Sequence, residues 1–268
     1  GTEGIVLAVD SRVTLTVQLP HPVKGQVALV PSTFDNATKL LQVTGQKFVG
    51  AVTYGVGALG QKEPRTAHSF MPEFEAELSK NKSGRLSVKA FAEELSKFFM
   101  RQWDEQGMPK QVEPGGTMVF YVAGYNEGEA YGHVYEIHIP SAPAPKEWHV
   151  GLFGVIWGGQ HEFVSRLISG FDPQLCDAAQ EFLKFSDDQK KGLEEHLKAK
   201  LQASIPFQFL PLQDCINLAI LLIRATMTIQ TFLIGVRGVG GAIDVATITK
   251  TEPINLVQTK SLVGEVKA

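Results

Sequence analysis

The sequence predicts an α+β fold, a four-layer αββα sandwich in which two antiparallel sheets pack face to face under helices on both outer faces. Strand-like segments come in blocks. In a protein with a parallel sheet, single strands would instead alternate with single helices. Two amphipathic helical segments follow the first block of strands, and a long apolar helical segment precedes the last block. The 268 residues suffice for one large core, so we expect a single domain over residues 1–268.

The first third of the chain is predicted to be β-structure. Its apolar, β-branched segments are separated by Pro, Gly, Asn and Asp. We expect strands over residues 5–9, 13–19, 26–30, 39–43 and 47–53. The sequence Thr44-Gly45-Gln46 predicts a hairpin turn between the last two strands. Glycines at 55, 57 and 60 predict a loop in which the backbone closely approaches another group.

Two helices are predicted next, over roughly 65–79 and 87–106, joined by a polar turn at 81–85. Phe70, Phe74 and Leu78 recur at a spacing of four, and Ser87 is a suitable N-cap for the second helix. Strands return at 117–124 and 131–139, with a hairpin signal between them. The proline-bearing segment 140–145 is expected to be a stiff surface connector.

The C-terminal part combines helices with two final strands. A helix is expected over 162–169, followed by a helical insertion at about 172–211 that contains a charged amphipathic helix at 189–200. The last long helix is predicted over 212–231, and strands over 243–249 and 254–259 close the chain. For that helix we expect an apolar inner face that consists of Leu212, Ile216, Ala219, Ile220 and Ile223.

Composition narrows the class of protein. With 20% charged residues and a net charge of −3, the chain has no basic character that predicts nucleic-acid binding. The two cysteines, Cys176 and Cys215, argue against a disulfide framework, and we expect reduced thiols in a cytoplasmic protein, with Cys215 on a buried helix face. We expect no apolar run to reach the length of a membrane span, and we therefore expect no membrane contact. The histidines lack the spacing of a metal site, and no metal or cofactor is predicted.

One acidic and one basic residue carry the functional prediction. An apolar run from Gly4 ends in Asp10, which predicts a strand buried on both faces with a carboxylate at its end. A buried carboxylate requires a partner, and Lys39, at the start of a later apolar run, is a natural one. Two alternatives stay open. The pair can be a purely structural ion pair, and Arg12 can compete with Lys39 for Asp10.

Five blocks in order resemble proteasome β-type subunits and their bacterial relatives, which are N-terminal-nucleophile (Ntn) hydrolases. The first ends in Asp10-Ser11-Arg12, and the last contains the Gly240-Gly241 pair followed by an apolar strand. The blocks are residues 4–12, 38–55, 87–103, 118–127 and 212–248. The resemblance also implies the αββα sandwich.

The resemblance implies a threonine-type peptidase or amidohydrolase. In such enzymes an N-terminal threonine attacks a peptide or amide bond, and its own α-amine acts as the base. By residue matching, Lys39 corresponds to the activating lysine, Asp10 to the aspartate that anchors it, and Gly55 to the oxyanion loop. The resemblance further implies a homo-oligomer, a peptide or small amide substrate, and an unfoldase as a partner to consider.

Several residues depart from the family pattern. Thr2 lies only eight positions before Asp10, one strand too close, so we expect the nucleophile upstream of the sequence given. Gly158-Gly159 stands where the family usually has Ser-Gly, and the segment 236–241 lacks the family's Asp and Ser. A non-catalytic structural or regulatory subunit is therefore the alternative prediction. A ligand-binding or biosynthetic relative is a third.

Overall fold

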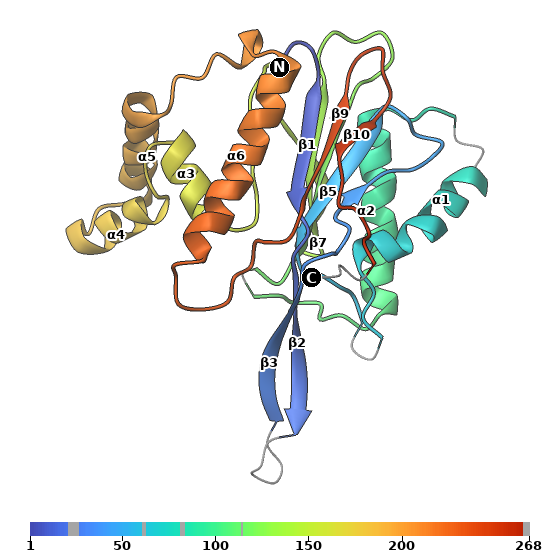
Figure 1. Cartoon of the computed structure of the whole chain (residues 1–268). Helices are drawn as coiled ribbons and strands as arrows, with labels where there is room; N and C mark the ends of the chain where they lie inside the picture. The colour runs from blue at the N-terminus through green and yellow to red at the C-terminus, as the bar shows by residue number, and fades with distance from the viewer. Residues whose placement is uncertain (21–26, 61–62, 81–83, 114, 265–268) are drawn as a thin grey trace.

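A computed structural model describes residues 1–20, 27–60, 63–80, 84–113 and 115–264 (Figure 1). The start of the strand predicted over 26–30 and part of the turn predicted at 81–85 lie outside these residues. The strands are β1 (Ile5–Asp10), β2 (Val13–Pro20), β3 (Val27–Phe34), β4 (Leu40–Leu41), β5 (Val49–Gly55), β6 (Met118–Gly124), β7 (His133–Ile139), β8 (Ala142–Trp148), β9 (Ile243–Ile248) and β10 (Asn255–Gln258). The α-helices are α1 (Met71–Lys80), α2 (Val88–Glu105), α3 (Glu162–Ile168), α4 (Gln174–Leu183), α5 (Asp187–Leu201) and α6 (Leu212–Gln230).

The molecule consists of four layers, as predicted. Helix α6 lies against β1, the sheet β1-β9-β10 faces the sheet β4-β5-β6-β7-β8, and α2 covers the far side of the larger sheet, with α1 next to it (Figure 1). All strand pairs described in these two sheets are antiparallel. The predicted α+β class with antiparallel sheets is therefore confirmed.

Two apolar clusters hold the layers together. The larger one fills the space between α1, α2 and the five-stranded sheet, and it is rich in aromatic rings, of which Phe99 and Phe120 have centroids 4.6 Å apart. The smaller one lies between the two sheets and includes Leu7 and Val9 of β1 and Val52 of β5. Helix α2 begins as predicted, because the Ser87 side chain accepts a hydrogen bond from Ala90 N. Strands β4 and β5 thus contact apolar clusters on both faces, and β1 contacts the smaller one.

Strands β2 and β3 form a hairpin that projects from the body of the molecule (Figure 1). Its register runs from Val13 opposite Phe34 to Pro20 opposite Val27. The hairpin leaves the body directly after β1 and returns directly before β4. Two segments that lie far apart in the sequence, the end of β1 and the start of β4, therefore meet at its base.

In the proline-bearing segment 140–145, a turn at 140–141 leads into strand β8, so the segment is not the predicted surface connector. Strand β8 pairs with β7 and forms the edge of the five-stranded sheet. Proline lacks an N–H donor, but an edge strand needs ladder hydrogen bonds on one side only. Pro143 and Pro145 are compatible with that position, which a pattern of prolines alone does not reveal.

The five residues predicted for the inner face of α6 are half-buried, and the most buried stripe lies beside them on the helix. The buried residues of this helix are Leu222, Thr226 and Gln230, which follow one another at a spacing of four. Cys215 is only half-buried, whereas Cys176 on α4 is fully buried. The expectation that placed Cys215 on a buried face is corrected accordingly.

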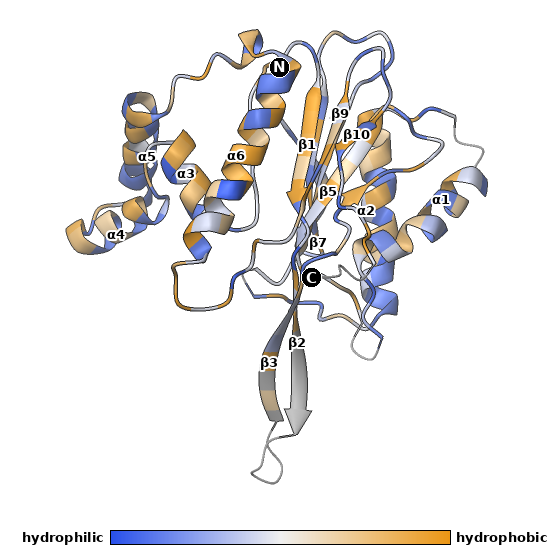
Figure 2. Ribbon diagram, viewed as in Figure 1, coloured by the Kyte–Doolittle hydropathy of each residue, from blue (hydrophilic) through white to orange (hydrophobic). Residues whose placement is uncertain are grey.

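Helix α6 is also long and apolar enough to cross a membrane, contrary to the sequence-based expectation. Its 18-residue window has a mean hydropathy of 1.4, and 11% of that window is buried. A single such helix is weak evidence, because core helices of water-soluble proteins pass the same test. Here α6 packs on β1 and α3. Figure 2 shows apolar residues along both α4 and α6.

Residues 172–211, expected to be a helical insertion, contain α4 and α5. Ser186 and Gln189 form a reciprocal capping box at the start of α5. The C-terminal side of this segment is tied to α3 by a hydrogen bond from Ala203 N to Ile168 O. Its origin as an insertion stays a prediction.

Candidate functional site

Asp10 and Lys39 meet at the base of the projecting hairpin. Lys39 Nζ lies 2.7 Å from Asp10 Oδ1, and the two side chains are 14% and 11% exposed. Asp10 Oδ2 accepts hydrogen bonds from the backbone N–H groups of Arg12, at 3.0 Å, and Gly240, at 2.9 Å. The carboxylate is thus held by three donors from three segments, which fixes the position of the lysine that it binds.

Gly55 lies at the end of β5, on the sheet edge that carries Lys39. Thr53 N donates to Lys39 O at 3.0 Å, and N–H directions alternate along a strand, so Gly55 N–H faces the same side. Strand β4 pairs with β5 only through Leu40 and Leu41, and no acceptor for Gly55 N–H is found in the described part of the chain. A backbone donor without a ladder partner therefore faces the edge next to Lys39.

The backbone at Gly55 requires glycine. Its φ is +85°, and an added Cβ would lie 2.2 Å from Thr117 O. The next residue, Val56, donates its N–H to the same Thr117 carbonyl at 2.9 Å. The glycine is needed for this sharp end of β5, whatever its N–H binds.

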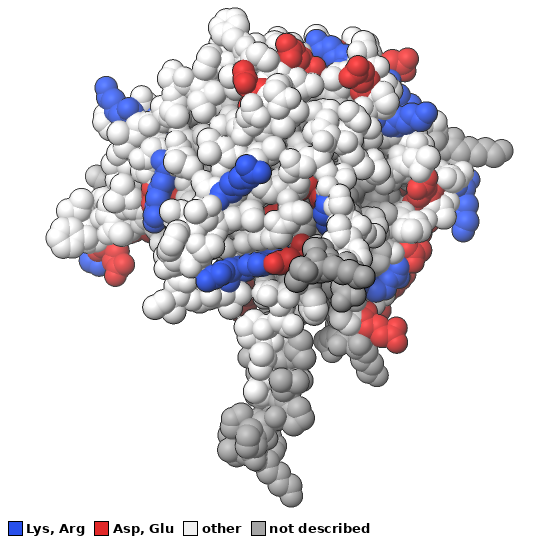
Figure 3. Space-filling model, viewed as in Figure 1, with Lys and Arg blue, Asp and Glu red and all other residues white. Residues whose placement is uncertain are grey.

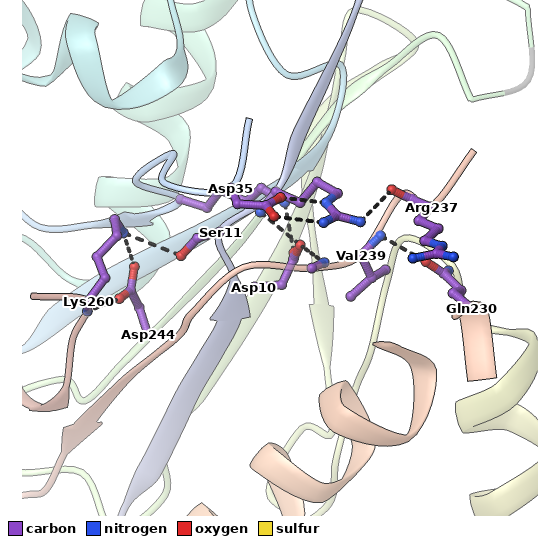
Figure 4. A network of polar contacts seen from close by, with 11 residues as sticks. Asp10, Ser11, Asp35, Gln230, Arg237, Val239, Asp244 and Lys260 are labelled. Carbon is purple, nitrogen blue, oxygen red and sulfur yellow. Dashed lines mark hydrogen bonds and ion pairs between the residues drawn. The ribbon is translucent and has the colours of Figure 1, made fainter. Parts of the chain in front are cut away.

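Arg12 does not compete with Lys39 for Asp10, because its guanidinium binds Asp35. Nε lies 2.5 Å from Asp35 Oδ1 and a terminal nitrogen lies 2.7 Å from Oδ2, which makes a bidentate pair. The pair raises the pKa of Arg12 and lowers the pKa of Asp35. Arg12 also donates to Arg237 O at 3.3 Å, and so it ties the hairpin base to the loop before β9 (Figure 4).

A second ion pair, between Asp244 and Lys260, lies next to the first. Lys260 Nζ pairs with Asp244 Oδ2 and lies 3.5 Å from Ser11 Oγ, while Lys260 N donates to Asp244 Oδ1 at 2.9 Å (Figure 4). Asp244 and Ser11 are buried. This pair was not predicted from the sequence. The sequence signal that could have predicted it is Asp244, a charged residue within an otherwise uncharged strand segment, Ile243–Ile248.

Three aromatic residues, Tyr54, Tyr121 and Trp157, are linked by a chain of hydrogen bonds that starts on β5. Tyr54 OH donates to Tyr121 OH at 3.3 Å, and Tyr121 OH donates to Trp157 O at 3.0 Å. Burial raises the pKa of Tyr54 to about 12, and it raises the pKa of Tyr121 further. A Cβ on Gly158 would lie 2.2 Å from Tyr54 Cζ. A serine at 158 would therefore require the Tyr54 ring to move.

Thr2 lies at the far end of β1 from this site. Its hydroxyl donates to Gln208 O at 3.3 Å, next to the start of α6. The six residues of β1 alone span roughly 20 Å. Thr2 is therefore not the group that Asp10 and Lys39 would activate.

The histidines do not form a metal centre in the described residues. His133 contacts two carboxylates, with Nδ1 2.7 Å from Glu147 Oε1 and Nε2 2.5 Å from Glu129 Oε2. Burial lowers the pKa of His133, but these two carboxylates outweigh it and raise the pKa overall. Over the described ranges, no group of three or more His, Cys, Asp or Glu side chains is placed to hold a metal ion.

Comparisons with known proteins give a fold likeness alone. No family model and no curated protein matches the chain. Among solved structures, the chain is similar to Anbu (ancestral beta-subunit) from Yersinia bercovieri, with 13% identity and a TM-score of 0.47, over 96% of this chain and 84% of that chain. A likeness at this level does not indicate shared chemistry.

Proposed function

We propose that this chain is a proteasome-like Ntn hydrolase that cleaves peptide or amide bonds. The observation that supports it most directly is the Asp10–Lys39 pair. Asp10 accepts three hydrogen bonds, which orient Lys39 at a partly buried sheet edge. A buried cation stabilises the deprotonated forms of a neighbouring amine and hydroxyl, which is what a threonine nucleophile needs. The free N–H of Gly55 supplies a donor for the oxyanion on the same edge.

In this proposal the nucleophile is a Thr, Ser or Cys on a strand that precedes Gly1. Strand β1 pairs with β9 on one side, and the described residues place no strand on its other side. A strand that enters β1 through a tight turn would run antiparallel along that free edge and begin beside Asp10. Its first residue would then be close to Lys39, where the chemistry requires it.

We further propose that the protein works as a homo-oligomer in the cytoplasm. Large apolar side chains are exposed on α4 and on the segment after α6, including Phe182 at 84% and Phe232 at 81%. Charged side chains leave broad uncharged areas between them in Figure 3. Exposed apolar surface of this kind is typical of protein interfaces, and a second copy is the occupant we favour. Analytical ultracentrifugation that shows a monomer at micromolar concentration would refute this part.

The alternative function is a non-catalytic structural or regulatory subunit. It is favoured by one specific observation, the glycine at 158 where the family usually places a serine, because any side chain there would require the Tyr54 ring to move. The segment before β9 also offers the backbone N–H of Gly240 where the family has polar side chains. In this case the Asp10–Lys39 pair would only join the ends of β1 and β4.

Two experiments separate these functions. The first is the N-terminal sequence and intact mass of the protein from its native host, followed by labelling with an electrophile directed at N-terminal threonine. The second is hydrolysis of fluorogenic peptides by Lys39→Ala, with the exposed Lys47→Ala as the matched control. We expect roughly 100-fold or greater loss for the first variant and no loss for the second. Unchanged hydrolysis in a folded Lys39→Ala protein would rule the mechanism out.

A further inference from the structure

His133, the first residue of β7, lies between two carboxylates. Its Nδ1 is 2.7 Å from Glu147 Oε1 on β8, and its Nε2 is 2.5 Å from Glu129 Oε2 in the turn that precedes β7. An ionised carboxylate has no proton to donate, so each contact requires a hydrogen on the imidazole nitrogen. Both nitrogens carry a hydrogen only in the charged imidazolium, and the neutral ring can therefore keep only one of the two contacts.

The exposure of the two carboxylates decides which contact the neutral ring keeps. The Glu147 side chain is 27% exposed, whereas that of Glu129 is 51% exposed. Water can replace the imidazole at Glu129 at little cost, but it reaches Glu147 less easily. Loss of the proton should therefore leave the hydrogen of Nδ1 on Glu147 and release Glu129.

Glu129 connects His133 to the start of α2 through Asn126. Asn126 Nδ2 donates to Glu129 Oε1 at 3.1 Å, and Asn126 Oδ1 accepts from Val88 N at 2.9 Å. Val88 is the first residue of α2, so its N–H has no partner within the helix. The orientation of the Asn126 amide, and with it this cap of α2, thus depends on where the Glu129 carboxylate is held.

The other charged and titratable groups around the ring do not replace these partners. Tyr135, on the same face of β7, lies nearly parallel to the imidazole with ring centroids 6.4 Å apart, and burial raises the pKa of Tyr135 to about 12. Strand β6 carries no charged side chain, and Lys146 of β8 lies over a tryptophan ring. On α2, Glu93 lies 4.0 Å from Lys89, and neither contacts the imidazole in the part of the chain that the structure describes.

We propose that His133, Glu129 and Asn126 form a proton-dependent clip that holds the turn 125–132 against the β7–β8 edge and the start of α2. With His133 protonated, all of these contacts are made. When His133 loses its proton, Glu129 leaves the ring and no longer fixes the Asn126 amide. Glu129 and Asn126 line a surface depression together with Arg85, so the shape and charge of this surface change with pH.

The clip lies away from Asp10 and operates whether or not the chain is a hydrolase. Gly132, next to His133, contacts the side chain of Ile5 at the start of β1, whereas Asp10 is the last residue of that strand. Burial lowers the pKa of His133, but the two carboxylates outweigh it and raise the pKa overall. The clip is therefore closed at low pH, and it opens above the pH range in which an exposed histidine titrates.

The test is an NMR titration of the full chain, labelled with ¹⁵N, from about pH 5 to about pH 9. The ring nitrogens of His133, the side-chain amide of Asn126 and the backbone amide of Val88 are followed together. We expect one shared midpoint above the range of an exposed histidine, and a neutral ring that carries its hydrogen on Nδ1. A neutral ring with its hydrogen on Nε2, separate midpoints, or no response of Asn126 and Val88 would overturn the proposal.

Two matched variants distinguish the clip from a general effect of charge. Glu129→Gln removes the carboxylate that the ring should release, and Glu127→Gln removes an exposed carboxylate two residues earlier in the same turn. Both side chains are exposed, so both variants should fold. In Glu129→Gln the His133 midpoint should fall, and the pH response of Val88 should be lost. Glu127→Gln should leave both unchanged, and equal effects of the two substitutions would reject the clip.

Discussion

Replacement of Asp10 by asparagine should destabilise the protein far more than the loss of an exposed ion pair. Asparagine keeps the size and the oxygen that accepts from Arg12 N and Gly240 N, but it removes the charge that faces Lys39. The lysine is only 14% exposed, so its ammonium is left with little water to replace the carboxylate. Removing one partner of a buried pair costs about 3–5 kcal/mol, and partial exposure places Asp10→Asn near 3 kcal/mol.

The matched control is Glu77→Gln, which breaks a pair of similar geometry at the surface. Arg101 lies 2.6 Å from Glu77, and both side chains are more than 40% exposed. Solvent screening limits such a pair to about 0–1 kcal/mol. Urea denaturation followed by circular dichroism measures both variants, with the slope of the transition checked for constancy. If Asp10→Asn cost no more than Glu77→Gln, the argument that the Asp10–Lys39 pair is buried and tightly held would be refuted.

The other predictions concern the glycine, a histidine and the two thiols. Gly55→Ala should lower the free energy of unfolding by more than Gly128→Ala, which has a similar positive φ but open space around it, and chemical denaturation compares the two. Because the pKa of His133 is raised in the folded state, its stabilising contribution is complete below about pH 6.5 and is lost as the pH rises through the folded-state pKa. His133→Gln should abolish this decline in melting temperature, and an unchanged decline would contradict the assignment. A thiol reagent such as DTNB should react with Cys215 in the native protein and with Cys176, whose thiol pKa is raised by burial, only after unfolding. Equal native reactivity of the two would count against the burial described.

The pairing of Asp10 with Lys39 was accessible from the sequence because burial leaves a carboxylate few alternatives. An apolar strand that ends in an acid requires a cation, and the second cation nearby, Arg12, is bound by Asp35. The sequence did not reveal how the fold brings Asp10 and Lys39 together. A projecting hairpin separates the two residues along the chain, and a backbone N–H, that of Gly240, completes the site. Backbone donors carry no sequence signal, so they become visible only with the fold.

The buried face of α6 was not accessible for a different reason. The helix is apolar around most of its circumference, so several stripes at helical spacing fit equally well. Its packing on β1 and α3 decides among them, and the stripe that is buried contains two polar residues, Thr226 and Gln230. Thr226 satisfies its hydroxyl within the helix, by donating to Leu222 O at 3.2 Å. Gln230 instead directs its amide to the loop before β9.

The energetics of buried ion pairs bear on whether Asp10 and Lys39 serve chemistry or structure. Such a pair is a poor device for stability alone, because apolar residues of similar volume often hold a core equally well or better. A double substitution such as Asp10→Leu with Lys39→Met should therefore cost less than Asp10→Asn alone, since neither charge is left unpaired. If the double variant folds and loses hydrolysis, stability does not explain why the charges are there. The two backbone N–H groups that hold Asp10 then act to position the ammonium of Lys39 for a nucleophile.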